Sequence, residues 1–151
     1  MVEIPDTHPR KRSLLSRQKI VEGSIRGLLA ESAMIAHGRG EAFDYLLGER
    51  TTESAGSAIR ETAARLMAAN HPVISVNGNT VLLAGKQALR LAAVLGCAVE
   101  VNLYYRSPER VNGLLALLEE QRTLVSDGDE PQGFEGDWRE SVMDVTLLGG
   151  S

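Results

Sequence analysis

The segment from Ile35 to Tyr45 holds the densest group of side chains able to do chemistry: an imidazole, a guanidinium and two carboxylates around two glycines. Glycine lets a backbone approach a ligand closely, and charged side chains supply strong hydrogen bonds at the same point. We therefore expect a ligand-binding site here, and not a segment that only fills a core. The polar members of the segment are His37, Arg39, Glu41 and Asp44.

His37 has two interpretations when it is taken alone. One is a core histidine whose ring bonds a backbone carbonyl, and the other is a group that binds or reacts with a ligand. Its neighbours Arg39 and Glu41 favour the second interpretation. No protein-bound metal is expected, because no second histidine or cysteine lies at the spacing of metal ligands.

Asparagine side chains follow two predicted strands. Asn77 and Asn79 come after the strand at 73–76, and Asn102 lies at the end of the strand at 98–103. Ligands bind outside the carboxyl ends of strands in an open parallel sheet, and an asparagine amide both donates and accepts hydrogen bonds. We expect these side chains to contact a ligand. The alternative for Asn-Gly-Asn is a good turn sequence without a ligand.

Arg106 comes just before Ser107-Pro108, which is a typical start of a helix. The N–H groups and dipole at such a start favour an anion, so one interpretation is a phosphate site with Arg106 and Arg110 nearby. The other interpretation of Arg106 is a surface salt bridge. The motifs GxxxxGK(S/T), GxGxxG and GxSxG are absent, so a bound nucleotide needs another kind of site.

The composition is that of a globular protein, and the charge excludes one class of partner. The chain has 151 residues, of which 43% are hydrophobic, and a net charge of −4, which argues against a general nucleic-acid binder. Cys97 is the only cysteine, so no internal disulfide forms, and we expect a small buried side chain. No signal peptide or stretch of about 20 apolar residues is present, which predicts a cytoplasmic protein with no membrane partner.

Apolar spacing predicts one α/β domain over residues 1–151, with an arm and helices in 1–50 and a sheet in 51–151. After the arm, a helix is expected from residue 13 to about residue 29. Gly23 and Gly27 lie inside it, and we attribute both to close packing of another helix.

The second half of the chain alternates between predicted strands and helices. A helix begins after Thr51 or Thr52 and stops at Asn70-His71-Pro72. The alternation that follows is the βαβ signature of a parallel sheet. Strands are expected at 73–76, 98–103, 123–126 and 142–148, helices at 86–95 and 108–121, and an acidic loop at 127–141.

Taken together, these blocks resemble one family, the archaeal 4-phosphopantoate–β-alanine ligases, also called phosphopantothenate synthetases. The resemblance covers most of residues 1–111 in order, and several separate motifs at matching spacing make it specific. It is thin beyond about residue 123. The matching blocks are Met1–Pro5, His8–Arg10, Ser13-Leu14, Arg17, Ile35–Tyr45, Gly48-Glu49, Asn70–Pro72, Ser75–Asn79 and Asn102–Arg110.

The resemblance implies a Rossmann-like parallel sheet with additional N-terminal helices, in a cytosolic homodimer. It also implies ATP-dependent joining of 4-phosphopantoate to β-alanine, which gives 4′-phosphopantothenate, AMP and diphosphate in coenzyme A synthesis. Mg²⁺ is expected with ATP, held largely by phosphates and water. The carboxylate is adenylated first, and the β-alanine amine then attacks the mixed anhydride.

The resemblance also assigns roles to individual residues. Family members contact ATP at the positions of Arg17 and Arg39, so both are expected to bind ATP here. Arg39 and His37 are the expected catalytic residues, with Arg39 neutralising charge that develops on the α-phosphate. Substrate binding is expected of Glu41, Asn77, Asn79, Asn102 and Arg106.

One departure from the family pattern concerns the end of the chain. Family members continue through further strands and helices, including a segment like Asp-Leu-Asn-Pro-Leu-Ser-Arg that adds ATP contacts, and no matching segment is present. We therefore expect a fold that is incomplete at its C-terminus, from an interrupted gene product or with a partner chain that supplies the rest. The alternatives to a ligase are a non-catalytic module that binds phosphopantoate or a nucleotide, and an interaction subunit.

Overall fold

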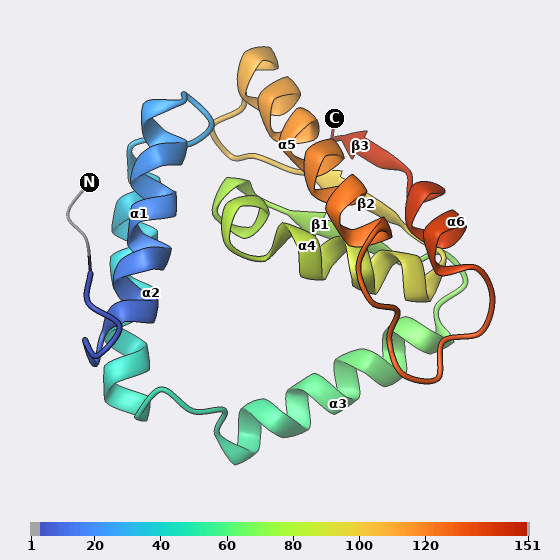
Figure 1. The fold of residues 1–151 in the computed structure, drawn as a ribbon, viewed down its shortest axis with the longest axis horizontal. Coiled ribbons are helices and arrows are strands. Elements are labelled where there is room, and N and C mark those ends of the chain that lie inside the picture. Colours follow the sequence, from blue (N-terminus) through green and yellow to red (C-terminus); the bar gives the residue numbers. More distant parts are fainter. Residues whose placement is uncertain (1–3, 151) are drawn as a thin grey trace.

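The computed structural model describes residues 4–150, so part of the predicted arm and of the block Met1–Pro5 lies outside the described residues. The protein is α/β, with a parallel sheet in the order β1-β2-β3 and additional helices that precede the sheet in the chain (Figure 1). This architecture confirms the expected fold class. The elements are α1 (Lys11–Ile25), α2 (Ser32–Leu47), α3 (Glu53–Ala68), β1 (Val73–Val76), α4 (Gly78–Leu95), β2 (Ala98–Val101), α5 (Pro108–Ser126), α6 (Trp138–Met143) and β3 (Leu147–Gly149).

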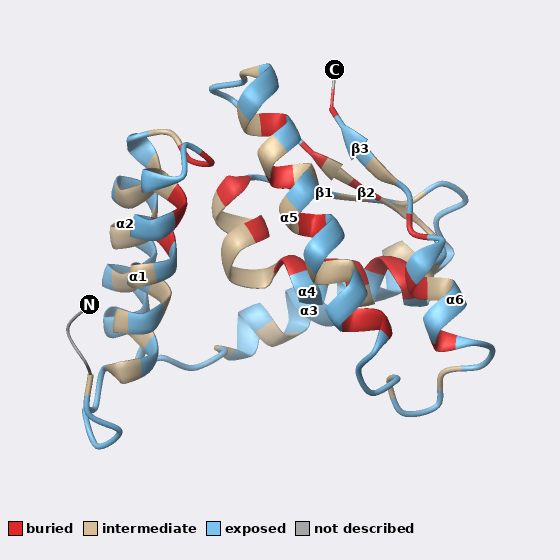
Figure 2. Cartoon of the chain, turned by 45° about the horizontal axis from the view of Figure 1, so that its top comes forward, coloured by how far each residue is buried: buried red, intermediate tan, exposed pale blue. Residues whose placement is uncertain are grey.

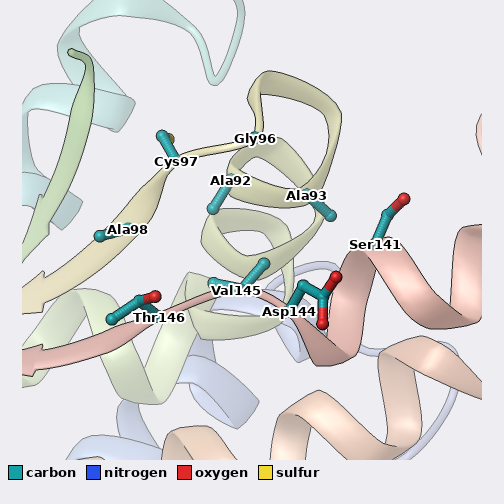
Figure 3. A pocket seen from close by; sticks show the side chains of 9 residues that line it. All are labelled: Ala92, Ala93, Gly96, Cys97, Ala98, Ser141, Asp144, Val145 and Thr146. Atoms are coloured by element: carbon teal, nitrogen blue, oxygen red, sulfur yellow. The ribbon is translucent and has the colours of Figure 1, made fainter.

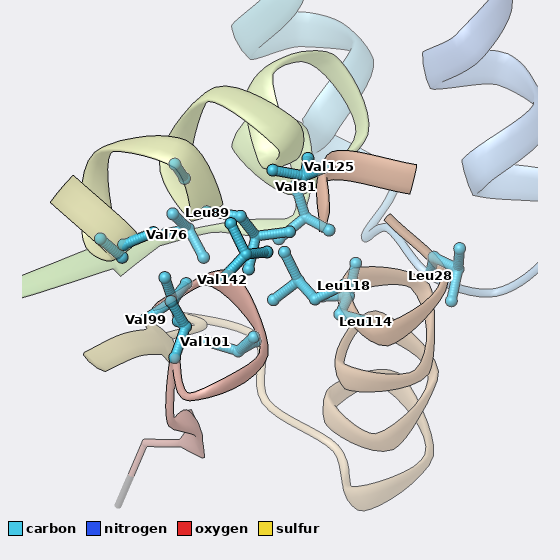
Figure 4. Close-up of a cluster of buried hydrophobic side chains, with 14 of the residues drawn as sticks. Leu28, Val76, Val81, Leu89, Val99, Val101, Leu114, Leu118, Val125 and Val142 are labelled. Carbon is cyan, nitrogen blue, oxygen red and sulfur yellow. The ribbon is translucent and has the colours of Figure 1, made fainter. Parts of the chain in front are cut away.

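The core lies between one face of the sheet and the helices α4, α5 and α6. Ile74 pairs with Val99 and Val76 with Val101, so the apolar side chains of β1 and β2 meet the helices on the same face. Because the strands follow one another in chain order, both crossover connections lie on that face. Figure 4 shows the buried side chains that meet there, which include Val76, Val81, Leu89, Val99, Val101, Leu114, Leu118, Val125 and Val142.

Side-chain caps start four of the helices. Thr52, Asn77, Ser107 and Asp137 each accept a hydrogen bond from the backbone N–H three residues further along the chain. Such a cap satisfies one of the N–H groups that a helix start leaves free. The predicted caps at Thr52 and Ser107 are therefore confirmed.

Helix α4 is kinked at Ala84, whose φ and ψ of −142° and 19° are not helical. The side-chain amide of Gln121, on α5, donates to the carbonyl oxygen of Val81 at 3.1 Å. A Cβ atom at residue 85 would lie 2.0 Å from Oε1 of Gln121, so the glycine there makes room for that side chain. The kink separates the first turns of α4 from the rest of the helix.

Several predicted boundaries in the sheet region were wrong. Residues 123–126 form the last turn of α5 and not a strand, because Leu114, Leu118 and Val125 continue one helical face into the core. The predicted strand at 142–148 starts as the end of α6, and only its last part pairs with β2. Helix α4 begins at residue 78, eight residues before the predicted start, because Asn77 caps it.

The first helix is shorter than predicted. It ends at Ile25, and Gly27 has a left-handed φ of 73° in the connection that follows. Gly23 lies inside the helix, and a Cβ atom there would come within 2.1 Å of a methyl group of Leu82. Close helix packing is therefore confirmed at Gly23 and wrong at Gly27, where the glycine allows the chain to turn.

The N-terminal helices form a hairpin that packs on the start of α4. Figure 1 shows α1 and α2 side by side, with α3 extending from their end to the start of the sheet. No residue of α3 is buried, and its apolar side chains Ile59 and Met67 are 61% and 79% exposed (Figure 2). Within the described residues, α3 thus connects two packed regions and belongs to neither.

Candidate functional site

The glycine-containing segment predicted to bind a ligand is helical. Residues 35–45 lie inside α2, and an ideal Cβ atom at Gly38 or Gly40 would meet nothing within 4 Å. The expectation that these glycines bring the backbone close to a ligand is therefore not supported by the local packing. The helix instead places side chains three and four residues apart on one face.

That face of α2 forms one wall of a hollow of about 510 Å³. The other walls come from α1 and from the start of α4. Three of the predicted ligand residues line it, His37, Glu41 and Asn79, which the structure thus brings together from separate elements. The remaining lining residues are Arg12, Ser13, Ser16, Gly40, Asp44, Tyr45, Glu49 and Leu83.

Glu41 is a mostly buried charged side chain in this hollow. Its side chain is only 12% exposed, Ser13 donates its hydroxyl to Oε1 at 2.5 Å, and the Arg10 guanidinium lies 3.9 Å from the same oxygen. The hydrogen bond from Ser13 lowers the pKa of Glu41 most, and the positive charges of Arg17 and Arg10 lower it further against the opposing effect of burial. The side chain is therefore a carboxylate at neutral pH.

His37 contributes a polar atom that the protein does not use. Its Nε2 atom is buried and has no hydrogen-bond partner among the described residues. Buried polar atoms are paired in most proteins, so an unpaired imidazole nitrogen beside a hollow marks a point where a ligand can bond. The core-histidine interpretation fails for this atom, because no backbone carbonyl satisfies it.

The two asparagines after β1 have different roles. Asn77 caps α4, with its side-chain oxygen accepting from the backbone N–H and the hydroxyl of Thr80, both at 3.0 Å. Asn79 donates its side-chain amide to the carbonyl oxygen of Ala33 at 3.0 Å, which ties the start of α2 to the start of α4. The Asn-Gly-Asn triplet is the cap and first turn of α4 and not a separate turn, and both of its asparagines bond within the protein.

A smaller cleft of about 160 Å³ lies at the carboxyl ends of β1 and β2. Asn77 and Asn79 line it together with Tyr104, Tyr105 and Arg110, so Asn79 borders both the cleft and the larger hollow. Arg110 donates to the carbonyl oxygen of Tyr105, and its buried Nε has no partner among the described residues. This position is suited to an anion, because the N-terminus of the 18-residue α4 points N–H groups toward it.

The structure leaves other predicted residues outside both cavities. Asn102 and Arg106 are exposed and line neither, and Arg110 takes the place at the cleft that sequence reasoning gave first to Arg106. Arg17 and Arg39 are exposed as well. Arg39 follows His37 by two positions, and such residues are about 200° apart around a helix, so it lies on another face of α2.

Sequence reasoning missed most of the α1 wall of the hollow. Arg12, Ser13 and Ser16 line it, and Ser13 holds Glu41. Their helical spacing was the available signal, since positions 12, 13 and 16 share one face of a helix. Which face of α1 meets α2 could not be read from that spacing alone.

A third depression, of about 290 Å³, lies at the amino end of β2 (Figure 3). Small side chains, Cys97, Ser141 and Asp144 surround it, and none of the predicted site residues is among them. Burial raises the pKa of the Cys97 thiol, which keeps it protonated and unreactive. Partial burial of Cys97 agrees with the expected packing role.

Residues 4–150 contain neither a cluster of metal-binding side chains nor a helix able to span a membrane. No group of three or more His, Cys, Asp and Glu side chains is placed to hold a metal ion in this part of the chain. None of the helices found there is both long and apolar enough to cross a bilayer.

Comparison with known proteins gives a consistent result. The family described as phosphopantothenate/pantothenate synthetase matches residues 54–136. A protein of Thermococcus kodakarensis is 54% identical over 111 residues, which are 74% of this chain and 42% of the relative. A protein of Methanospirillum hungatei JF-1 is 50% identical over 125 residues, or 83% of this chain and 51% of the relative. Both are named 4-phosphopantoate–beta-alanine ligase, and the chain spans about half the length of these curated relatives.

Proposed function

The chain belongs to the phosphopantothenate/pantothenate synthetase family, and from this premise we propose that it serves the ATP-dependent joining of 4-phosphopantoate to β-alanine. The products are 4′-phosphopantothenate, AMP and diphosphate. The observation that carries the proposal is the hollow in which His37, Glu41 and Asn79 meet, in a chain about half identical to proteins named as this ligase.

The cleft at the strand ends is the proposed site for the phosphate of 4-phosphopantoate. Arg110 and the first N–H groups of α4 supply positive charge and donors, and Asn79 supplies an amide beside them. A phosphate bound there lies at the border with the hollow, because Asn79 lines both. The reacting molecules carry like charges and repel one another. Binding them side by side therefore lowers the activation barrier of such a reaction more than an acid–base group does.

ATP is the second substrate in this proposal. The exposed guanidinium groups of Arg17 and Arg39, on α1 and α2, are free to contact its phosphates, and Mg²⁺ would accompany ATP through its phosphates and water. Arg39 lies outside both cavities, so its proposed role in stabilising negative charge on the α-phosphate rests on the family resemblance alone. The acyl adenylate then reacts with the amine of β-alanine, and AMP leaves.

The proposal includes a homodimer in the cytoplasm. Exposed apolar side chains on α2 and α3 support association, among them Phe43 and Leu46, which are 64% and 80% exposed. Large apolar surfaces of this kind are rare on monomers. Sedimentation of the purified chain over a range of concentrations tests this point, and a monomer at all concentrations would contradict it.

A second candidate function is a binding module without ligase activity. The cleft favours it, because Arg110, Asn79 and the first turn of α4 can bind a phosphate without any adenylation. An assay of AMP release with ATP, 4-phosphopantoate and β-alanine separates the two functions. AMP release that needs all three substrates supports the ligase, whereas calorimetric binding of 4-phosphopantoate without AMP release supports the module.

Replacing Arg39 by alanine tests the proposed adenylation directly. We expect AMP release to fall by about 10²–10³-fold, the loss typical of removing one donor to a developing negative charge. The matched control is Arg60→Ala on the exposed helix α3, which removes the same charge far from both cavities. Unchanged turnover in Arg39→Ala would show that this residue takes no part in adenylation.

A further inference from the structure

The hollow between α1 and α2 carries charges of both signs on different helices. Arg12 contributes a guanidinium from α1, while α2 contributes the carboxylates of Glu41 and Asp44, and the turn that follows α2 contributes that of Glu49. A site for a phosphate group alone would not be lined by three carboxylates, because they repel an anion. Such a lining instead complements a small molecule that carries a cation at one end and an anion at the other.

Glu41 is the anchor for the cationic end. Both of its recorded polar contacts, with Ser13 and with Arg10, are made by Oε1. Its second oxygen, Oε2, has neither a hydrogen bond nor an ion pair with any described residue. A carboxylate accepts about four hydrogen bonds, so Oε2 remains able to bind an ammonium group.

His37 adds a proton acceptor beside this carboxylate. It lies four residues before Glu41 on the same helix and lines the same hollow, and its buried Nε2 has no partner among the described residues. In the neutral ring with its proton on Nδ1, Nε2 has a lone pair available. An ammonium held by Glu41 therefore finds a base within the same cavity.

From these observations we infer that the hollow is the subsite for the amino acid substrate, a short zwitterion such as β-alanine. Glu41 binds its ammonium, Arg12 binds its carboxylate, and His37 accepts the proton that the ammonium must lose. The volume of about 510 Å³ accommodates so small a molecule and leaves room for the acyl group entering from the cleft. This inference rests on the proposed ligase function and assigns one of its substrates to named residues.

The chemical step follows from this placement. The ammonium transfers one proton to Nε2 of His37, which becomes an imidazolium, and the freed lone pair attacks the carbonyl carbon of the acyl adenylate. A C–N bond forms, and the C–O bond to the adenylate phosphate breaks with its electron pair leaving on AMP. The amide nitrogen then loses its second proton to solvent. Every group in this balance comes from the proposed substrates or from His37.

The test separates the two halves of the reaction. Exchange of labelled diphosphate into ATP, driven by 4-phosphopantoate, reports adenylation and needs no amine. Amide formation with β-alanine reports the second half. Trapping of the acyl adenylate with hydroxylamine reports attack by a nucleophile that is neutral near pH 7 and needs no base or ammonium subsite.

Glu41→Gln keeps an oxygen for the Ser13 hydroxyl but removes the charge that binds the ammonium. We expect KM for β-alanine to rise by about 10- to 100-fold, the effect of losing a hydrogen bond to a charged group. Exchange and hydroxylamine trapping stay at the wild-type rate. Glu22→Gln is the matched control, because it removes the same charge from an exposed position of α1 outside the hollow.

His37→Gln removes the base and keeps a polar side chain of similar reach. We expect kcat for amide formation to fall by about 10²–10⁴-fold with little change in KM for β-alanine, while exchange and trapping are unchanged. A merely structural role would lower all three rates together. That result, in either variant, would overturn the inference.

A failure of the proposed function gives a different result. If the wild-type chain shows no exchange with 4-phosphopantoate, adenylation by this chain is excluded, and calorimetric titration with β-alanine then tests the subsite alone. Binding that Glu41→Gln weakens at least tenfold, and Glu22→Gln leaves unchanged, supports the subsite. Equal affinity in both variants, or tighter binding of inorganic phosphate than of β-alanine, would contradict it.

Discussion

The sheet region at 73–150 and the helical region at 4–72 differ in how many apolar side chains they bury. The sheet and its helices contain nearly all of the buried apolar side chains, whereas the helical region contributes only Ile20, Leu28 and Leu29. Figure 2 shows the same contrast, with buried residues concentrated on α4 and α5 and exposed ones along α3. The sheet region thus provides most of the buried core, and the helical region provides most of the polar side chains that line the hollow.

The two regions meet at the first turns of α4, and the candidate site lies at that junction. Gly23 packs against Leu82, and Gly78 packs against Leu29, each where an added Cβ atom would collide. Asn79 bonds the carbonyl oxygen of Ala33 across the same junction. We therefore expect substitutions in the sheet region to lower the free energy of unfolding most, and substitutions of the polar residues on the hairpin to weaken ligand binding.

The largest expected effect is on folding, from a substitution in the core. Leu118→Ala removes a side chain with no exposed surface, and we expect the free energy of unfolding to fall by about 2–5 kcal/mol. Ile59→Ala, on the unpacked face of α3, is expected to change it by less than about 0.5 kcal/mol. Urea unfolding followed by circular dichroism measures both. Equal losses would show that α3 packs as part of the core.

A pair of glycine substitutions tests the junction itself. At Gly23, an added methyl group meets Leu82 at 2.1 Å, so we expect Gly23→Ala to destabilise the protein by about 1–3 kcal/mol. At Gly38, the same change meets open space inside α2 and is expected to stabilise the protein by about 0.5–1 kcal/mol. The same unfolding assay applies. A stabilised Gly23→Ala would mean that the hairpin does not pack on α4 as described.

The smallest effect concerns the charge on Glu41. Its pKa is lower in the folded protein than in the unfolded chain, so its contribution to stability is present above about pH 4.3, the ordinary glutamate value. That contribution is lost as the pH falls through the lower folded pKa. We expect Glu41→Gln to lose less stability than wild type as the pH falls below about 4.3. If the free energy of unfolding depends on pH in the same way in both proteins, the hydrogen bond from Ser13 does not lower the pKa of Glu41.

The sequence predicts the alternating elements of the sheet region well, because strand and helix patterns there repeat with clear signals. The residue types alone predicted the strand at 73–76, a strand at 98–103 that the structure ends at residue 101, a cap at Thr51 or Thr52, and the cap at Ser107. Residues 123–126 were predicted wrongly because a short apolar run at the end of a helix has the same sequence pattern as a buried strand. The spacing of side chains decides such a case only when the neighbouring element is known.

The site was less predictable than the fold. The residue types identified His37, Glu41 and Asn79, but the two glycines, expected to bring the backbone close to a ligand, lie inside a helix with open space beside them. The assignment of Arg39 to ATP stays a prediction, since it rests on the family resemblance and not on a contact. The wall formed by α1 could not be foreseen, because it depends on how the hairpin packs on α4.

Amide chemical-shift mapping during titration with 4-phosphopantoate and β-alanine tests the central claim most directly. We predict shifts at the hollow and the cleft, in residues 12–16, 37–45, 77–80 and 103–110, with none in α3 or around Cys97. Shifts confined to α3, or to the depression bordered by Cys97 and Asp144, would contradict the placement of the site at the junction.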